Sequence, residues 1–249
     1  MPINKHVLST RFDAASASYD HVASVQQFAA EFLLRQLELN WPNFNPQSVL
    51  ELGAGSGYLS ELILARFPQS TLILNDLSAK MLDRAKSRLN SAAITYVCGD
   101  FDELQFAEVD LLISNLALQW STDLEKTLTK GYLSAKRFAF SGLLQGTFFE
   151  WDAVFKACQL PSPVHRYCTR REVETMLSAL NPKDFFFATQ TVRLSFENAH
   201  AIMRYLQNLG ASLGQQALSV AELKRVIKQF QQPMQLTYQL FFALLVRRD

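Results

Sequence analysis

The stretch that decides the fold reads Ser-Val-Leu-Glu-Leu-Gly-Ala-Gly-Ser-Gly-Tyr-Leu-Ser and spans residues 48–60. A short apolar run ends in a carboxylate, three glycines follow at every second position, and a helical pattern begins. This order predicts a strand, a tight turn and a helix. Glycine is needed where φ is positive or where a ligand approaches the backbone. We therefore expect a ligand beside Gly53, Gly55 and Gly57, at the tip of the strand.

The spacing of these glycines indicates the class of ligand. The dinucleotide fingerprint is G-x-G-x-x-G, in which a helix N-terminus faces a pyrophosphate. Here the third glycine comes one residue early, and Glu51 precedes the first glycine by two positions, where it would repel a pyrophosphate but suit a cation. The motif, with Ala54 between its glycines, resembles the first motif of the S-adenosylmethionine-dependent methyltransferases. That resemblance implies S-adenosyl-L-methionine as cofactor and S-adenosyl-L-homocysteine as product.

A second carboxylate supports a ligand that contains ribose. The apolar run over residues 71–78 ends around Asp76, which lies 23 residues beyond Gly53. Acidic residues that bind ribose hydroxyls in nucleotide-binding βαβ units lie at about this distance. The alternative interpretation is that the glycines belong to an ordinary loop and that Asp76 is an unrelated surface residue.

Strand and helix patterns alternate from residue 48 onward and predict an α/β fold. Strands are expected over 48–51, 71–75, 94–98, 109–114, 136–143, 185–195 and 236–246. Helices are expected after the first, second and fourth strands, so a mostly parallel sheet should carry helices on both faces. Ligands bind beyond the carboxyl ends of such strands, where Glu51, Asp76, Asp100 and Asn115 are placed. The methyltransferase resemblance implies a Rossmann-like, seven-stranded sheet with an antiparallel last strand.

Two helical segments flank this core. A leading segment, residues 1–47, contains an apolar helical pattern around Val25–Leu37, preceded over residues 11–20 by a polar stretch too short to fold alone. About forty residues, roughly 197–233, separate the last two strands and contain helical patterns over 198–209 and 220–230. We expect this insertion to cover the cofactor as a lid. Without repeats or a long linker, residues 1–249 are predicted to form a single domain.

Composition limits the possible functions. Hydrophobic residues make up 49% and charged residues 19%, as in ordinary globular proteins. The net charge of +1 gives no reason to expect nucleic-acid binding. No signal-peptide pattern and no apolar run of the ~18 residues that a membrane span needs is present, so we expect a soluble, cytoplasmic protein and a monomer.

Cysteine and histidine spacing gives no metal or redox motif. Cys98, Cys158 and Cys168 are widely spaced, without a C-x-x-C pair, and are expected to be reduced and mostly buried. The four histidines lack metal-ligand spacing and are expected at the surface or at helix caps.

Residues 115–120, Asn-Leu-Ala-Leu-Gln-Trp, narrow the family. They resemble a signature of the malonyl-acyl-carrier-protein O-methyltransferases of biotin synthesis. Similar segments recur along nearly the whole chain, at residues 11–20, 75–82, 144–147, 165–167, 203–211 and 236–238. The sequence departs from the family at the turn over 133–136, at Gln207, where a basic residue is common, and mildly in the first motif.

The resemblance also assigns roles to residues of the site. It implies that Asp100 accepts a hydrogen bond from the adenine amino group, that Leu77 belongs to the second cofactor motif, and that the backbone of Asn115 and Leu116 lines the methyl donor's sulfur. Phe101 either stacks on the base or fills the core, and we favour the core. Tyr19, Gln119 and Trp120 are expected to form substrate-pocket walls.

The reaction implied is direct displacement by a substrate carboxylate, with malonyl-acyl-carrier protein as substrate. A carboxylate is ionised at neutral pH, so we expect no catalytic acid or base. Arginine suits carboxylate recognition, and Arg204 and Arg166 are the candidates for a carboxylate clamp. The alternative interpretation is that each is an ordinary surface arginine. Two alternatives stay open: a methyltransferase acting on another small acid or a quinone, and a catalytically silent nucleoside-binding module.

Overall fold

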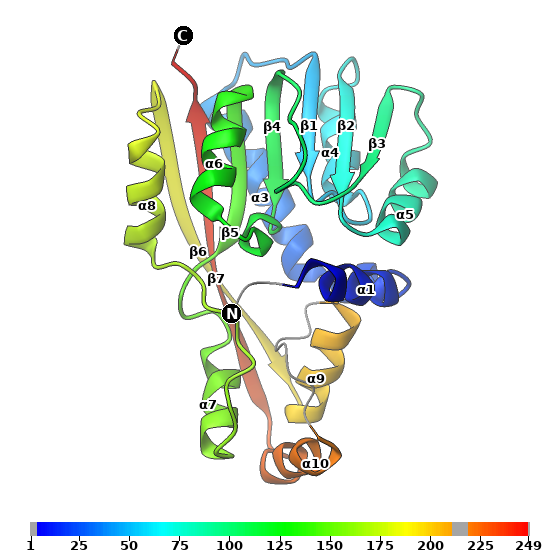
Figure 1. The fold of residues 1–249 in the computed structure, drawn as a ribbon, viewed down its shortest axis with the longest axis vertical. Coiled ribbons are helices and arrows are strands. Elements are labelled where there is room, and N and C mark those ends of the chain that lie inside the picture. Colours follow the sequence, from blue (N-terminus) through cyan, green and yellow to red (C-terminus); the bar gives the residue numbers. More distant parts are fainter. Residues whose placement is uncertain (1–3, 211–218, 249) are drawn as a thin grey trace.

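The computed structural model describes residues 4–210 and 219–248, and it contains a seven-stranded sheet in the order β3-β2-β1-β4-β5-β7-β6 (Figure 1). The strands are β1 (Ser48–Leu52), β2 (Thr71–Asp76), β3 (Ile94–Cys98), β4 (Val109–Asn115), β5 (Ala135–Leu143), β6 (Asp184–Phe196) and β7 (Met234–Val246). Strand β7 runs antiparallel to both of its neighbours, whereas the pairs among β1 to β5 are parallel. This is the Rossmann-like arrangement expected from the sequence.

Helices cover both faces of this sheet. The helices are α1 (Lys5–Ala15), α2 (Tyr19–Val22), α3 (Ser24–Asn40), α4 (Tyr58–Arg66), α5 (Ala79–Leu89), α6 (Leu124–Leu133), α7 (Phe149–Ala157), α8 (Arg170–Ala179), α9 (Ala199–Asn208) and α10 (Val220–Gln229), with a short 3-10 helix η1 (Leu118–Trp120). Because strand side chains alternate between faces, Leu111 of β4 packs in the core under α3 and α4, and its neighbour Leu112 packs in the core under α6 and α8.

The two outer strands, β6 and β7, extend beyond the ends of the other strands and carry the insertion (Figure 1). Helices α9 and α10 follow β6 and precede β7. Helix α9 contacts α1, α2 and α10. At its end, Gly210 has φ of +71°, and a Cβ added there would lie 2.8 Å from Cδ1 of Phe12. The insertion therefore packs against the leading helices at one end of the sheet.

Three details differ from the sequence-based expectations. The polar stretch over residues 11–20 lies within α1 and α2, because contacts with α5 and α9 stabilise helices too short to be stable alone. Cys98 is exposed and only Cys158 is fully buried, so the prediction of mostly buried thiols was wrong. The last two strands begin one or two residues earlier than expected.

Within residues 4–210 and 219–248, no helix is both long and apolar enough to cross a membrane. In the same ranges no group of three or more His, Cys, Asp or Glu side chains is placed to hold a metal ion.

Candidate functional site

A cavity with two lobes lies at the carboxyl ends of the parallel strands, where the fold predicts a ligand site. The lobes contain about 390 and 580 Å³ of space and share four lining residues, Tyr19, Gly53, Gly55 and Asn115. The shared residues make the two lobes parts of one site.

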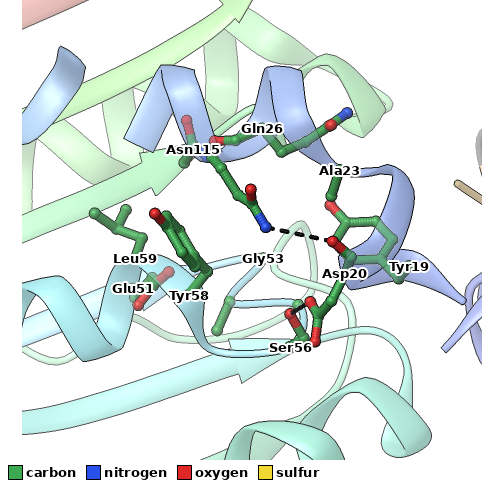
Figure 2. A pocket seen from close by; sticks show the side chains of 13 residues that line it. Tyr19, Asp20, Ala23, Gln26, Glu51, Gly53, Ser56, Tyr58, Leu59 and Asn115 are labelled. Carbon is green, nitrogen blue, oxygen red and sulfur yellow. Dashed lines mark hydrogen bonds between the residues drawn. The ribbon is translucent and has the colours of Figure 1, made fainter. Parts of the chain in front are cut away.

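The first lobe lies between the leading helices and the β1–α4 turn (Figure 2). Its further lining residues are Asp20, Ala23, Gln26, Gln27, Glu51, Ala54, Ser56, Tyr58 and Leu59. Figure 2 shows side chains of the leading segment opposite those of the glycine motif. The Oε1 atom of Gln26 is buried and has no hydrogen-bond partner in the described part of the chain. A ligand that donates hydrogen bonds would satisfy such an atom.

The second lobe extends over the ends of β2 and β3. Its further lining residues are Lys5, Leu8, Phe12, Asp76, Leu77, Met81, Asp100, Phe101, Leu116, Ala117 and Trp120. It is the more apolar half, with side chains from α1 on one side and from the strand ends on the other. A flat aromatic base and a ribose fit this combination of apolar walls and carboxylates.

Each glycine of the motif has a separate structural reason. Gly53 has φ of +70°, and an added Cβ would meet the Cβ of Ala117 at 2.2 Å. Gly57 has φ of +82°, and its Cβ would lie 3.0 Å from the Cβ of Ala85 on α5. Gly55 differs, because a Cβ there would meet no atom of the described residues within 4 Å, its own chain neighbours aside. The space beside Gly55 is cavity, as expected for a glycine that lets a ligand approach the backbone.

Glu51 is a buried carboxyl group at the floor of the first lobe. Its side chain accepts a hydrogen bond of 2.5 Å from the Ser60 hydroxyl, and the residue is only 1% exposed. Burial raises the pKa of Glu51 to about 8, against the opposing effect of the Ser60 hydrogen bond and with a smaller contribution from Asp76. Buried carboxyl groups of this kind favour a nearby cation.

Asp76 ends β2 and is tied to the backbone on both oxygens. Its Oδ2 accepts from the N–H of Gly55 and its Oδ1 from the N–H of Ser78, each at 2.8 Å. Burial raises the pKa of Asp76 to about 6, although these backbone hydrogen bonds oppose the shift. A carboxylate oxygen accepts more than one hydrogen bond, so Asp76 keeps acceptor capacity for ribose hydroxyls.

Asp100 lies at the mouth of the second lobe and is paired with Lys5 of α1. The Lys5 ammonium lies 2.8 Å from Oδ1 of Asp100 and 2.8 Å from Oδ2 of Asp102. It also lies 4.9 Å from the ring centroid of Phe101. Phe101 is buried in the core and lines the cavity as well, so filling the core does not prevent it from facing a ligand.

The end of β4 presents a constrained backbone between the lobes. The Asn115 amide donates to the Gln26 carbonyl at 2.9 Å and accepts from the Ser141 hydroxyl at 2.7 Å. Leu116 has φ of +48°, a left-handed conformation that non-glycine residues rarely adopt. Its N–H donates to the Ser141 hydroxyl at 3.1 Å. Such backbone strain is concentrated at functional sites. That the backbone of Asn115 and Leu116 lines the methyl donor's sulfur stays a prediction.

Polar contacts hold the leading helices over the strand ends, a role that the sequence analysis missed. Lys5, Ser9 and Asp13 of α1 recur at four-residue intervals and so share one face. The Ser9 hydroxyl donates to the Leu77 carbonyl at 3.2 Å, and the Ser78 hydroxyl donates to Asp13 at 2.5 Å. The four-residue spacing of these polar side chains could have indicated from the sequence that one face of α1 makes polar contacts.

Asp20 of α2 anchors the leading segment to the glycine motif. Its carboxylate accepts from the Ser56 hydroxyl at 2.5 Å and from the Arg88 guanidinium at 3.0 Å. Arg88 also donates to the Ser56 carbonyl at 3.0 Å. This network joins α2, the glycine turn and α5. Nothing in the spacing of these three residues indicated it.

The predicted substrate-pocket residues are only partly brought together. Tyr19 and Trp120 line the cavity. Gln119 does not line either lobe, and its amide donates to the Leu116 carbonyl at 2.5 Å. His165, expected at the surface or at a helix cap, is partly buried with its ring centroid 6.1 Å from that of Trp120. It extends the aromatic wall toward the buried Tyr167, at 5.4 Å.

The two candidate arginines lie outside the cavity. Arg204 is exposed on α9, next to the buried Tyr205. The Arg166 side chain is 90% exposed and lies 3.7 Å from the Glu172 carboxylate. Neither side chain lines a lobe of the cavity.

The donor set of the cavity fits a cationic nucleoside. Glu51 and Asp76 lie at its floor, and Lys5 is the only lysine or arginine among the described lining residues. Because Lys5 already pairs with two aspartates, no unpaired positive side chain among these residues faces the cavity to bind a pyrophosphate. A sulfonium and an ammonium beside Glu51, with ribose beside Asp76, satisfy the same charges.

Comparisons with known proteins agree with this geometry. A family model described as a methyltransferase domain matches residues 49–135. A malonyl-[acyl-carrier protein] O-methyltransferase of Neorickettsia risticii (strain Illinois) is 33% identical over 226 residues, which are 91% of this chain and 90% of that protein. The protein of the same name from Methylococcus capsulatus is 32% identical and covers 83% of this chain and 77% of its own length.

Solved structures share the fold at low sequence identity. The phosphoethanolamine N-methyltransferase 2 of Haemonchus contortus, in complex with S-adenosyl-L-methionine, superposes with a TM-score of 0.60 at 15% identity over 95% of this chain and 57% of that one. The plantazolicin methyltransferase BpumL, in complex with S-adenosylhomocysteine, superposes with a TM-score of 0.52 at 16% identity. The match covers 97% of this chain and 89% of that one. With the relatives that match over nearly the full length, these findings show that the chain belongs to the malonyl-[acyl-carrier protein] O-methyltransferase family.

Proposed function

We propose that this protein transfers the methyl group of S-adenosyl-L-methionine to the free carboxyl group of a malonyl thioester on acyl-carrier protein, an early step of biotin synthesis. The choice of S-adenosyl-L-methionine as methyl donor rests on the pair of buried carboxyl groups, Glu51 and Asp76, on either side of the open space at Gly55. The choice of a malonyl thioester as methyl acceptor is supported by the names of the relatives that match over most of their length.

The chain's own part in this reaction is orientation and exclusion of water. When bound, the cofactor supplies an electrophilic methyl group on a sulfonium. The substrate carboxylate is already ionised at neutral pH and needs no base to attack. Burial raises the pKa of Tyr19 well above its ordinary value, so the phenol stays neutral at the shared wall of the two lobes. Anion and cation neutralise each other in the transition state, so a dry site favours the reaction.

Alignment of the two reactants is the other contribution. Well-oriented reactions gain up to ~7–11 kcal/mol from pre-organisation. The constrained backbone at Leu116, the glycine turn and the aromatic side chains of Tyr19 and Trp120 all line the site. These groups hold the reacting atoms without taking or giving a proton.

Arg204 is the proposed partner of the malonyl carboxylate, with Arg166 as second candidate. Two observations support Arg204: it lies on α9, which packs against the leading helices that line the cavity, and it has no ion pair within the described ranges. Because its side chain is exposed, contact with the substrate requires α9 or the side chain to turn inward. Losing a charge-assisted contact typically costs about 1.5–3 kcal/mol.

Methyl transfer from labelled cofactor tests the proposed function. The acceptors are malonyl-carrier protein, malonyl-coenzyme A, unloaded carrier protein, and other small acids and quinones. Label in a base-labile ester of the malonyl acceptors supports the proposal. Transfer only to another acid or a quinone would show that the proposed substrate is wrong. Tight binding of S-adenosylhomocysteine without turnover on any acceptor would indicate a silent nucleoside-binding module.

The Arg204 assignment has its own test. Arg204→Ala should lower kcat/KM for the malonyl thioester roughly ten- to a hundred-fold with S-adenosylhomocysteine affinity nearly unchanged, and Arg204→Lys should restore part of it. Full activity in Arg204→Ala would remove Arg204 from the site, and Arg166→Ala would then be measured in the same way.

A further inference from the structure

Helix α10 presents a basic face that is not used within the described structure. Lys224, Arg225 and Lys228 are exposed, whereas Val226 is fully buried. With 3.6 residues per turn, the three basic residues lie within about 100° of one another on the helix, and Val226 points to the opposite side. We call these three residues the α10 basic face.

The charges of this face are only partly neutralised, because Arg225 alone interacts electrostatically with Glu222 of the same helix. Among residues 4–210 and 219–248, neither Lys224 nor Lys228 makes an ion pair. Glu222, the acidic residue of the same helix, is held by the helix N-terminus, where it accepts from the Ser219 N–H at 2.8 Å and the Ser219 hydroxyl at 2.7 Å.

Positive charge is concentrated in the insertion. Residues 197–233 contain four Lys and Arg and two Asp and Glu, a net charge of +2. The whole chain has 24 Lys and Arg and 23 Asp and Glu. The residues outside the insertion therefore have 20 basic and 21 acidic side chains, a net charge of −1. The chain is thus slightly acidic outside the insertion and basic within it.

The α10 basic face lies near the cavity without lining it. Helix α10 contacts α9, and α9 contacts α1 and α2, which provide Lys5, Phe12 and Tyr19 to the cavity wall. Figure 1 shows α1 just below the parallel strands, with α9 and then α10 following it downward. A macromolecule bound on α10 would therefore be one helix layer from the cavity.

We infer that the α10 basic face is the docking surface for the acyl-carrier protein that delivers the acyl group, and that the partner presents carboxylates to this face. The inference rests on the proposed function and adds the place where the partner binds. Cations one helical turn apart match carboxylates repeated at the same spacing on a partner. Exposed charges of this kind mainly steer association and are screened by salt.

A charge-reversal variant separates docking from chemistry. K224E/K228E should lower kcat/KM for malonyl-carrier protein about five- to fifty-fold at low salt, mainly through KM. Activity on malonyl-coenzyme A, which has no protein to dock, and S-adenosylhomocysteine affinity should not change. Raising the salt concentration should slow the parent on carrier protein and have little effect on the variant.

The matched control is R171E/K183E, which makes the same change in net charge at two exposed basic residues outside the insertion. This control should keep the parent's activity on both thioesters. Equal losses in the two double variants, unchanged activity of K224E/K228E on carrier protein, or an equal loss on malonyl-coenzyme A would overturn the inference. Binding of an RNA or DNA oligonucleotide that K224E/K228E abolishes while carrier kinetics stay unchanged would also overturn it.

Failure of the proposed function would be seen separately. If the parent methylates neither malonyl thioester, the reaction assignment is wrong whatever α10 does. Calorimetric titration of the parent and both variants with carrier protein then tests docking directly. Binding lost only in K224E/K228E supports the docking surface, and absent or equal binding in all three proteins refutes it.

Discussion

Binding of a cationic ligand should release the proton of Glu51. The pKa of this carboxyl is about 8 in the described structure, because burial disfavours its charged form. At pH 7 the ratio of protonated to ionised Glu51 is therefore about ten to one. A cation beside Glu51 favours the carboxylate and lowers its pKa. The affinity for S-adenosylmethionine should thus rise with pH below 8, by up to about tenfold or 1.4 kcal/mol per pH unit.

Calorimetry between pH 6.5 and 8 measures this effect. Titrations in buffers with different ionisation enthalpies give the number of protons released, which should approach one at pH 6.5 and decline toward pH 8. Asp76, with a pKa of about 6, contributes mainly below this range. Glu51→Gln is the control, because it keeps the shape of the side chain and removes the titration. Proton-neutral binding with the same affinity at pH 6.5 and 8 would refute the reasoning.

The same group predicts how folding stability depends on pH. The folded-state pKa of Glu51 is raised above its ordinary value of 4.5, so the folded chain binds the proton more tightly than the unfolded chain does. The contribution of protonated Glu51 to stability is present below pH 4.5 and is lost as pH rises toward 8. The unfolding free energy should therefore fall more between pH 5 and 8 in the parent than in Glu51→Gln, as measured by urea denaturation.

Two further predictions concern the cofactor site and the insertion. Asp76→Ala should weaken S-adenosylhomocysteine binding by about 1–3 kcal/mol, because ribose hydroxyls lose a charged acceptor, and Gly55→Val should weaken it more, because its side chain would fill the cavity; parent-like affinity in both by calorimetry would disprove the site assignment. Tyr205→Phe should lower the unfolding free energy by about 1–2 kcal/mol, because the buried hydroxyls of Tyr205 and Tyr238 lie 2.7 Å apart and bond α9 to β7. The same change at Tyr132, whose partner is a backbone N–H, shows the cost of an ordinary buried phenol hydrogen bond, and no loss in Tyr205→Phe would contradict the prediction.

The parallel half of the fold could be predicted because its signals are local. The glycine motif, the apolar strands and the acids at their ends follow one another along the chain, and the structure places Glu51 and Asp76 around one cavity. Each of these features depends on backbone conformation or burial that nearby residues determine. The family resemblance added the antiparallel direction of the last strand, which the structure has in β7.

The packing of α1 and α2 over the cavity could not be predicted in the same way. Lys5 meets Asp100 and Asp102 across 95 and 97 residues, and Asp20 meets Arg88 across 68. Their side chains are common surface types, and only the folded sheet brings them together. The exposed position of Arg204 has a similar cause, because its neighbour Tyr205 turns toward β7 and so directs Arg204 outward.

The contact between Gly210 and Phe12 has a consequence for the order of folding. Residues nearly two hundred positions apart must meet before the wall of the cavity around α1 is complete. Closing so long a loop costs conformational entropy, and contacts between distant residues slow folding. During synthesis on the ribosome, α1 emerges long before α9. A nascent chain can therefore assemble the glycine motif and the parallel strands while its first helix still lacks the surface on which it packs.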